Sequence, residues 1–361
     1  MLATLTYTMN TAPPKGRGTA RAPDSRFLDW QREPSDDGWP QDAPTPPLRT
    51  QLQIDTARSV ITTNQSPDVP FTQSINPYRG CEHGCVYCFA RPSHAYLGLS
   101  PGLDFETRLA WKPDAASLLR AELSARGYHC SPIALGVNTD AYQPVERELG
   151  VTREILQVLA ECHHPVVIIT KSALIERDLD ILGPMAREGL VQVMVSVTTL
   201  VAELARSLEP RATAPHRRLR TIRTLAEAGV PVGVLFAPLI PALNDEEMET
   251  ILSTARAQGA STAGYGVLRL PREVGPLFEH WLNDHAPGRA AHVMSLVRQL
   301  RDGRVNDARF GQRMRGSGLF ADLYRQRFAL ACKQLGLAPR HLALDTQRFT
   351  PPGADRQGRL F

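Results

Sequence analysis

The sequence reads Ile75-Asn-Pro-Tyr-Arg-Gly-Cys81-Glu-His-Gly-Cys85-Val-Tyr-Cys88-Phe-Ala-Arg-Pro-Ser-His-Ala-Tyr96 where an extended apolar segment runs into a glycine-interrupted loop. Cys81, Cys85 and Cys88 occupy positions i, i+4 and i+7, so their thiolates can point at one centre. Thiolate ligands at such spacing favour zinc or an iron–sulfur cluster. The next cysteine, Cys130, lies far along the chain in a different expected element. A cluster held by only three thiolates leaves one iron open to another ligand.

The alternative interpretation of this loop is a structural zinc site with His83 or His94 as the fourth ligand. Zinc sites more often come as two paired groups of ligands, and this stretch has only one group. The spacing of the cysteines by itself leaves both zinc and an iron–sulfur cluster open.

The composition is that of a soluble globular protein. Hydrophobic residues make up 42% and charged residues 22% of the 361 residues, and the net charge of +4 permits an anionic partner without requiring one. This length suits one catalytic domain with extensions. We expect residues 1–55 to be a disordered or extended N-terminal segment because they are rich in proline and polar residues. Residues 56–270 would form the core, and residues 271–361 a helical C-terminal extension.

The cysteines outside the loop predict a reducing compartment. Cys130, Cys162 and Cys332 are scattered through apparent core segments, which is not the pattern of a disulfide framework. The first residues lack the pattern of a secretory signal, and no apolar run is long enough to span a membrane. We therefore expect a cytoplasmic protein, without membrane contact and monomeric.

Strand and helix patterns alternate through the expected core. Extended or β-branched runs predict six strands, at residues 71–78, 133–137, 165–170, 191–197, 232–236 and 262–268. Amphipathic spacing predicts helices between them, at residues 115–126, 151–162, 174–188, 215–228 and 245–258. This alternation predicts an α/β fold with a parallel sheet and helices outside it. Right-handed crossovers would curl the sheet into a (β/α)6 partial TIM barrel.

Cys81-x3-Cys85-x2-Cys88, with Tyr87 directly before the last cysteine, resembles the signature of the radical S-adenosylmethionine (SAM) superfamily. The resemblance implies a [4Fe-4S] cluster on the three cysteines, with SAM chelating the open iron. Reductive cleavage of SAM would then give methionine and a 5′-deoxyadenosyl radical that abstracts hydrogen from a substrate. The flanking residues resemble the branch that includes spore photoproduct lyase. The stretch Leu97-Gly-Leu-Ser-Pro-Gly-Leu-Asp-Phe-Glu106 is similar to a group of radical SAM proteins defined by sequence and not by a known reaction.

The resemblance also implies roles for residues at the carboxyl ends of the strands, where parallel barrels place their chemistry. Lys171, after the third strand, would suit the SAM carboxylate, and Ser196, in the fourth, would suit the ribose. Tyr87 would offer its backbone to the adenine, and Pro238 would belong to an apolar adenine wall. Asn138 falls where the family has a glycine-rich methionine-binding motif, but this sequence lacks the paired glycines.

Other residues near the strand ends have two interpretations each. Arg211 is expected either to lie near the SAM carboxylate or to pair with Glu209. Asn244 or Asp245, after the fifth strand, would suit the site or cap the following helix equally well.

One departure from the lyase concerns its extra cysteine, which donates hydrogen close to the end of the second strand. This sequence has Asn138 and Thr139 in that zone. Cys130 precedes the strand, so we expect it at the opposite end of the barrel as a small buried apolar residue. We therefore do not expect the lyase reaction itself. No second cysteine group follows the barrel, which predicts chemistry with one cluster.

The C-terminal third begins with helical apolar spacing over residues 273–300, followed by an arginine-rich stretch from Arg301 to Gly316 that contains Phe310. A helix with Tyr324 and Phe328 comes next. Basic residues beside aromatic ones suit nucleic acid. The favoured alternative is a solvated helix surface over aromatic core residues, because no recognised nucleic-acid module is present.

The preferred interpretation is a radical SAM enzyme that is reduced by a partner such as flavodoxin or ferredoxin. Nucleic acid is the best guess for its unidentified substrate. Two alternatives stay open. One is a non-catalytic, zinc-stabilised nucleic-acid-binding protein, and the other is a radical SAM enzyme acting on a peptide or a metabolite.

Overall fold

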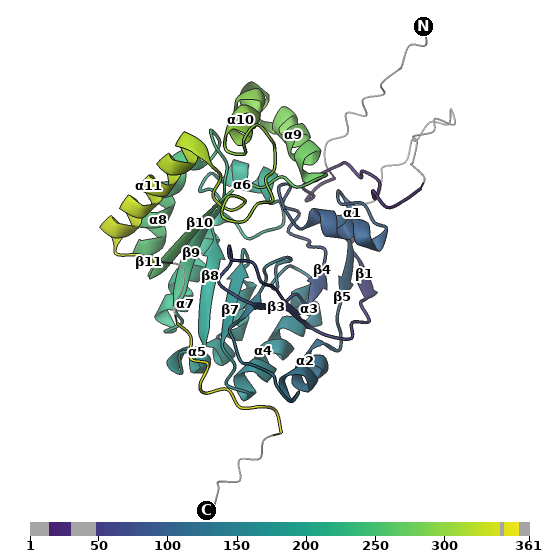
Figure 1. Ribbon diagram of the computed structural model, residues 1–361, viewed down its shortest axis with the longest axis vertical. Coiled ribbons are helices and arrows are strands. Elements are labelled where there is room, and N and C mark those ends of the chain that lie inside the picture. Colours follow the sequence, from purple (N-terminus) through teal and green to yellow (C-terminus); the bar gives the residue numbers. More distant parts are fainter. Residues whose placement is uncertain (1–13, 30–47, 340–342, 354–361) are drawn as a thin grey trace, which may run out of the picture.

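The computed structural model describes residues 14–29, 48–339 and 343–353. Its centre is a twisted parallel sheet with helices on its outer face (Figure 1). The six expected strands lie side by side in sequence order: β3 (Gln73–Ile75), β6 (Ile133–Leu135), β7 (Val166–Thr170), β8 (Val191–Ser196), β9 (Val232–Leu239) and β10 (Thr262–Val267). All five pairings between them are parallel. The predicted α/β fold with six parallel strands is confirmed.

Two short strands form the edges of this sheet. The antiparallel strand β2 (Ile61–Thr63) pairs with β3, and β11 (Ala338–Pro339) pairs in parallel with β10. Among the described residues β2 and β11 do not pair with each other, so the sheet curls without closing. The barrel is therefore partial, as the sequence predicts.

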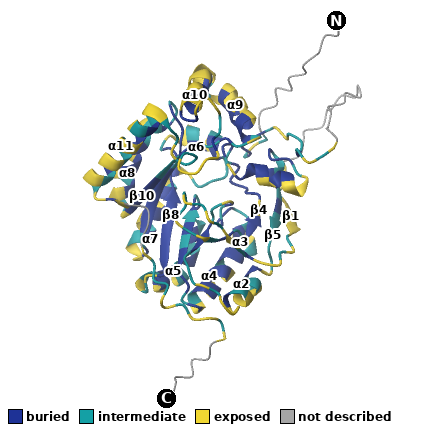
Figure 2. Ribbon diagram, viewed as in Figure 1, coloured by how far each residue is buried: buried dark blue, intermediate teal, exposed yellow. Residues whose placement is uncertain are grey.

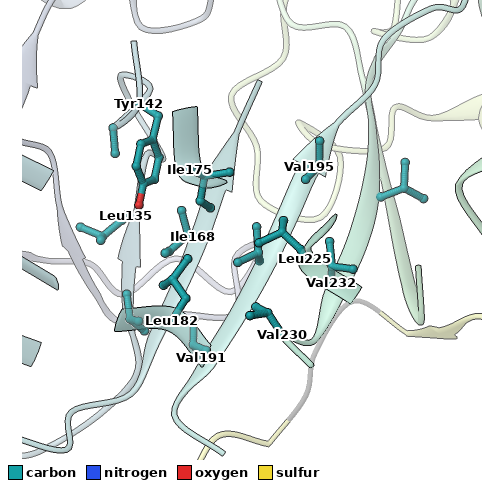
Figure 3. Packing of buried hydrophobic residues seen from close by; sticks show 14 of the residues in the cluster. Leu135, Tyr142, Ile168, Ile175, Leu182, Val191, Val195, Leu225, Val230 and Val232 are labelled. Atoms are coloured by element: carbon teal, nitrogen blue, oxygen red, sulfur yellow. The ribbon is translucent and has the colours of Figure 1, made fainter. Parts of the chain in front are cut away.

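The core lies between the sheet and the helices that connect its strands. These helices are α2 (Ala115–Leu123), α4 (Val151–Glu161), η2 (Ala173–Asp178), α5 (Leu179–Arg187), α7 (Pro215–Glu227), η3 (Asp245–Glu247) and α8 (Met248–Ala257). Figure 3 shows Ile168 and Val195 from the strands packed near Ile175, Leu182 and Leu225 from the helices. Burying each such side chain contributes about 1.5–3 kcal/mol, which explains why the β-branched runs located the strands well.

The helical region that follows is divided where proline interrupts it. The apolar spacing over 273–300 becomes two helices, α9 (Val274–His285) and α10 (Pro287–Gln299), because Pro287 suits the first turn of a helix but not its interior. The helix α11 (Gly318–Leu335) lies against α8, and a shorter one, α6 (Ala202–Leu208), follows β8. Figure 2 shows exposed outer faces on α10 and α11. Within the described ranges, no helix is long and apolar enough to cross a membrane.

A second, three-stranded sheet was not expected from the sequence. Its order is β1 (Gln51–Ile54), β5 (Arg108–Trp111) and β4 (Tyr78–Arg79). Three short helices accompany it: η1 (Arg91–Leu97), α1 (Asp104–Thr107) and α3 (Glu146–Leu149). These elements are too short to show periodicity. They frame the cysteine loop, which lies between β4 and η1.

The N-terminal residues 14–29 contain turns and bends without a helix or strand, and they pack against the rest of the molecule. The backbone N–H of Gly18 donates to Glu106 Oε2 at 2.8 Å, and that of Leu103 donates to the Arg21 carbonyl at 3.0 Å. A Cβ atom added at Gly18 would lie 1.8 Å from the Gly84 carbonyl oxygen. We call residues 14–29 the strap. Residues 1–13 and 30–47, also predicted to be disordered or extended, lie outside the described residues.

The C-terminal tail, residues 343–353, covers the amino ends of the central strands and is drawn in yellow in Figure 1. Its backbone bonds to the loops at that end: Thr350 N–H donates to the Cys162 carbonyl at 2.9 Å. The Phe349 ring packs against Tyr128 and His164. Cys130 lies at this end, before β6 as predicted, but it is half-buried rather than buried. All six cysteines are free thiols.

Candidate functional site

The cysteine loop turns twice at glycines. Gly80 has φ of +82° and Gly84 has φ of +68°, values that favour glycine. Between and after these turns, Cys81 N–H donates to the Phe105 carbonyl at 2.9 Å and Cys88 N–H donates to the Cys85 carbonyl at 3.2 Å. The loop backbone is thereby fixed at each of the three cysteines.

A buried ion pair holds the loop from behind. Arg91, which is 0% exposed, donates from Nε to the Cys85 carbonyl at 2.9 Å and from Nη2 to the Gly84 carbonyl at 3.2 Å. The same Nη2 lies 2.6 Å from Glu106 Oε1, which is equally buried. Both residues belong to stretches that carried the family resemblance, but spacing gave no sign that they pair. They position the loop that carries the thiols.

The three cysteines of the loop differ in burial: Cys81 is buried, and Cys85 and Cys88 are half-buried. Burial raises the pKa of Cys81, and the charges of Asp140, Cys85 and Cys88 raise it further. Burial, followed by the charge of Glu209, raises the pKa of Cys85 to about 12. Burial also raises the pKa of Cys88. Because metals bind the thiolate, loading this site would release protons.

The donor set fits a cluster better than a single ion. In the described ranges, no three side chains of the His, Cys, Asp or Glu type converge as one metal ion requires. In a [4Fe-4S] cluster each thiolate binds its own iron, so three soft ligands around a shared space suffice. Each histidine considered for a zinc set is held through one ring nitrogen: His94 Nε2 bonds to the Arg108 carbonyl at 2.8 Å, and His83 Nδ1 lies 3.4 Å from Asp140 Oδ2. The other nitrogen of His94 has no hydrogen-bond partner among the described residues.

A buried carboxylate, Glu209, collects several groups beside the loop. It pairs with Arg218, accepts a hydrogen bond from the Tyr87 hydroxyl, and accepts another from Thr198 Oγ1 at 2.6 Å. Lys171 Nζ lies 3.9 Å from its Oε1. Burial alone would raise the pKa of Glu209, but Arg218 and Lys171 outweigh it and lower the pKa to about 2. The carboxylate is therefore charged, although sequence reasoning saw Glu209 only as a possible partner of Arg211.

Lys171 stands between this carboxylate and the end of the second strand. Its Nζ lies 5.9 Å from the centre of the Tyr87 ring, and its backbone N–H donates to Asp140 Oδ2 at 2.7 Å. Asp140 also accepts a hydrogen bond from Thr170 Oγ1 at 2.7 Å. Asp140 thus joins the ends of β6 and β7, a role that the sequence did not indicate.

Ser196 and Pro238 lie on neighbouring strands at the same end of the barrel. Ser196 ends β8, is 2% exposed, and accepts a hydrogen bond from Arg218 Nη1 at its carbonyl at 3.0 Å. Pro238 lies in β9, and its carbonyl accepts from Asn244 Nδ2 at 3.0 Å. The same Nδ2 donates to the Thr198 carbonyl at 2.8 Å. Asn244 is the N-cap residue of η3, as one of its two interpretations expected, but its side chain makes no cap hydrogen bond and joins the ends of the two strands instead.

Two predicted site residues lie apart from this group. Asn138 is exposed, and its backbone N–H donates to Asn76 Oδ1 at 3.0 Å. Arg211 Nη1 lies 2.7 Å from Glu82 Oε1, so the expected pairing with Glu209 is wrong. Glu209 forms its ion pair with Arg218 instead. The structure thus gathers Tyr87 and Lys171 on Glu209, with Ser196 and Pro238 at adjacent strand ends.

Two of the five arginines in the C-terminal stretch from Arg301 to Gly316 pair with carboxylates of the described residues. Arg309 pairs with Asp302 and Asp307, and Arg313 pairs with Asp68. Arg313 also lies 4.8 Å from the centre of the Phe310 ring, which is 60% exposed. Pairing within the chain supports the solvated-surface alternative, while the exposed ring keeps a binding role open.

Comparison with known proteins agrees with this geometry. Residues 75–255 match the family model described as the radical SAM superfamily. An uncharacterized protein of Mycobacterium tuberculosis is 36% identical over 233 residues, which cover 64% of this chain and 68% of that protein. An uncharacterized protein of Methanocaldococcus jannaschii is 26% identical over 173 residues, covering 48% of this chain and 62% of the relative.

A solved structure of similar fold is a spore photoproduct lyase mutant with bound AdoMet and dinucleoside spore photoproduct. Its TM-score is 0.57 at 14% identity, covering 81% of this chain and 82% of the lyase chain. At this identity the likeness establishes the fold alone. The match over half the sequence, around three cysteines on one loop, means that the chain belongs to the radical SAM superfamily.

Proposed function

We propose that the protein is an enzyme that holds a [4Fe-4S] cluster on Cys81, Cys85 and Cys88 and binds SAM at the carboxyl ends of the central strands. When bound, the cluster supplies the electron that cleaves SAM to methionine and a 5′-deoxyadenosyl radical, which abstracts hydrogen from the substrate. The observation that carries this proposal is the placement of three thiols, one buried and two half-buried, on one loop beside Lys171 and the charged Glu209. A partner such as flavodoxin or ferredoxin would donate the electron to a monomeric enzyme.

The residues around the thiols would bind and orient SAM. Lys171 offers a cation to its carboxylate, and Glu209 keeps that cation in place. The Ser196 hydroxyl has no hydrogen-bond partner in the part of the chain that the structure describes, which leaves it available to a ribose. Pro238 would give the adenine an apolar contact. Asn138 and Arg211 carry less of this proposal because they lie apart from the group.

The first test counts metal in the purified protein. Protein reconstituted with iron and sulfide without oxygen should be brown and hold about four irons per chain. Cys85→Ala should lose that iron, while Cys130→Ala, at the amino end of the barrel, should keep it. A colourless wild-type protein with one tightly bound zinc would contradict the proposal and support the zinc-stabilised alternative.

For the substrate, we propose a nucleic acid. Support comes from two exposed aromatic rings with arginines over them. Phe310 lies under Arg313, and Phe89, which is 40% exposed and follows Cys88, lies 5.0 Å from the Arg269 guanidinium. Arginine and aromatic side chains stack on bases and attract phosphates. A peptide or metabolite substrate is the competing proposal, because Arg309 and Arg313 already pair with carboxylates of this chain.

Binding of duplex and single-stranded oligonucleotides across a salt series separates these substrates. Nucleic-acid binding should weaken as salt rises, and Arg313→Ala with Arg315→Ala should weaken it further. Unchanged affinity in this double variant, or no salt-dependent binding by the wild type, would count against nucleic acid.

A further inference from the structure

A cavity of about 710 Å³ lies beside the cysteine loop and has no part in the proposed chemistry. Its walls come from the strap, from residues 48–52, from Glu82 and His83 of the loop, and from the loops after β6, β7 and β8. Of the residues predicted for SAM or the cluster, Arg211 is the one that lines it. This volume is within the range of about 300–1,000 Å³ typical of small-molecule sites.

The cavity is strongly basic. Five cations line it, against the two carboxylates of Glu82 and Glu148: Lys15, Arg17, Arg49, Arg147 and Arg211. Lys15, Arg49 and Arg147 are exposed and form no ion pair with any residue that the structure describes. Burial, and then the nearby charge of Arg211, lower the pKa of Arg17, so these cations are close enough to repel each other. An anion with several charges would relieve this repulsion.

The remaining lining argues for more than a bare anion. Leu48 and Leu52 are 44% and 41% exposed and form an apolar part of the wall together with Val145. Glu82 is 2% exposed, and its Oε2 accepts no hydrogen bond from the described residues. An unused buried acceptor suits an amino or hydroxyl group. The cavity therefore offers cations, an apolar surface and an acceptor in one place.

We propose that this cavity binds a nucleoside polyphosphate. Guanidinium groups match phosphate oxygens with two hydrogen bonds at once, which suits Arg49 and Arg147. The base would lie on the leucine wall, and Glu82 would accept from the ribose or the base. Tyr87, Lys171, Ser196 and Pro238 do not line this cavity, so we place it apart from the proposed SAM site, and binding there would not require the cluster.

The test titrates cluster-free protein with ATP, GTP and inorganic triphosphate by calorimetry. One of the two nucleotides should bind, and Arg49→Gln with Arg147→Gln should weaken that binding at least about tenfold. Leu52→Ser should weaken nucleotide binding but not triphosphate binding. The matched control is Arg220→Gln with Arg223→Gln, in a second basic cavity of about 560 Å³ along α7, which should leave affinity unchanged. Lys15→Gln, at an exposed side chain, replaces the double variant if that one does not fold.

Several results would overturn the proposal. If neither nucleotide binds, or if the control variant loses as much affinity, the proposed site is ruled out. If inorganic triphosphate binds as tightly as the nucleotide, the cavity recognises the phosphates and not the nucleoside. Displacement by SAM would identify the cavity as the SAM site, and tighter, equally arginine-dependent binding of an oligonucleotide would make it a nucleic-acid surface. None of these results requires SAM cleavage, so they are distinguishable from failure of the proposed enzyme function.

Discussion

The two ends of the barrel differ in the charge of a buried ionisable side chain: one is charged and the other is neutral. At the carboxyl ends of the strands, Glu209 is fully buried and charged, because Arg218 and Lys171 lower its pKa to about 2 against the effect of burial. At the amino ends, His164 is also fully buried, but burial lowers its pKa to about 4 and keeps it neutral. Its partners there are the Tyr128 hydroxyl and the Phe349 ring.

This difference shows what each end is built for. A buried ion pair rarely stabilises a fold more than apolar residues of similar volume would. Packing alone therefore does not account for the Glu209 group, whereas a site that must orient a charged ligand does. The amino end needs only to be closed, and neutral rings and a backbone-bonded tail close it.

The largest expected effect is at the charged end. Glu209→Gln leaves Arg218 buried without its counter-ion, which should lower the free energy of unfolding by about 3–5 kcal/mol. Chemical denaturation of the cluster-free protein measures this loss. Glu249→Gln, which breaks the partly exposed pair with Arg327, is the control and should cost less than about 1 kcal/mol. Equal losses in the two variants would erase the distinction between this carboxylate and an ordinary surface one.

The next effect concerns the strap behind the cysteine loop. Gly18→Val should lower the free energy of unfolding by about 1–3 kcal/mol, because its Cβ would overlap the Gly84 carbonyl. Limited proteolysis should then cut within residues 14–29 sooner than in the wild type. Gly288→Ala, where an added Cβ meets nothing within 4 Å, should not increase cleavage. A strap equally protected in Gly18→Val would show that it does not pack on the loop.

A smaller effect is expected from the ring that closes the amino end. Phe349 is half-buried, so Phe349→Ala should lower the free energy of unfolding by about 1–2 kcal/mol. Iron content after reconstitution should not change, since the ring lies at the end opposite the thiols. Loss of iron in this variant would mean that the two ends are not independent.

The smallest effect at neutral pH comes from His164 and develops only in acid. Its pKa is about 4 in the fold and 6.5 in the unfolded chain, so between these values the unfolded chain binds more protons. Stability from this residue is complete above pH 6.5 and is lost as the pH falls toward 4. His164→Gln should therefore show a shallower decline of the denaturation midpoint across that range. An identical decline in both proteins would place the acid sensitivity elsewhere.

Features set by residues that are neighbours in the chain could be predicted from the sequence. Side-chain pairings between residues far apart in the chain could not. The six strands followed from extended or β-branched runs, although the end of the first run, Tyr78, lies in β4 of the second sheet. The cysteine loop followed from its spacing. The pairing of Arg211 with Glu82 joins residues 129 positions apart, and nothing local indicated it. Asn244 had the local features of a helix cap, but β8 and β9 bring Thr198 and Pro238 within its reach. The strap had the composition of a disordered segment, yet its glycine fits against another glycine in the loop.

Release of 5′-deoxyadenosine tests the central proposal most directly. Reconstituted wild-type protein given dithionite and SAM without oxygen should release it, and Cys85→Ala should not. Lys171→Gln, which keeps the thiols, should raise the SAM concentration needed for half-maximal release. Release that is absent from wild-type protein holding about four irons, or unchanged in Cys85→Ala, would contradict the assignment of this loop as the site of SAM cleavage.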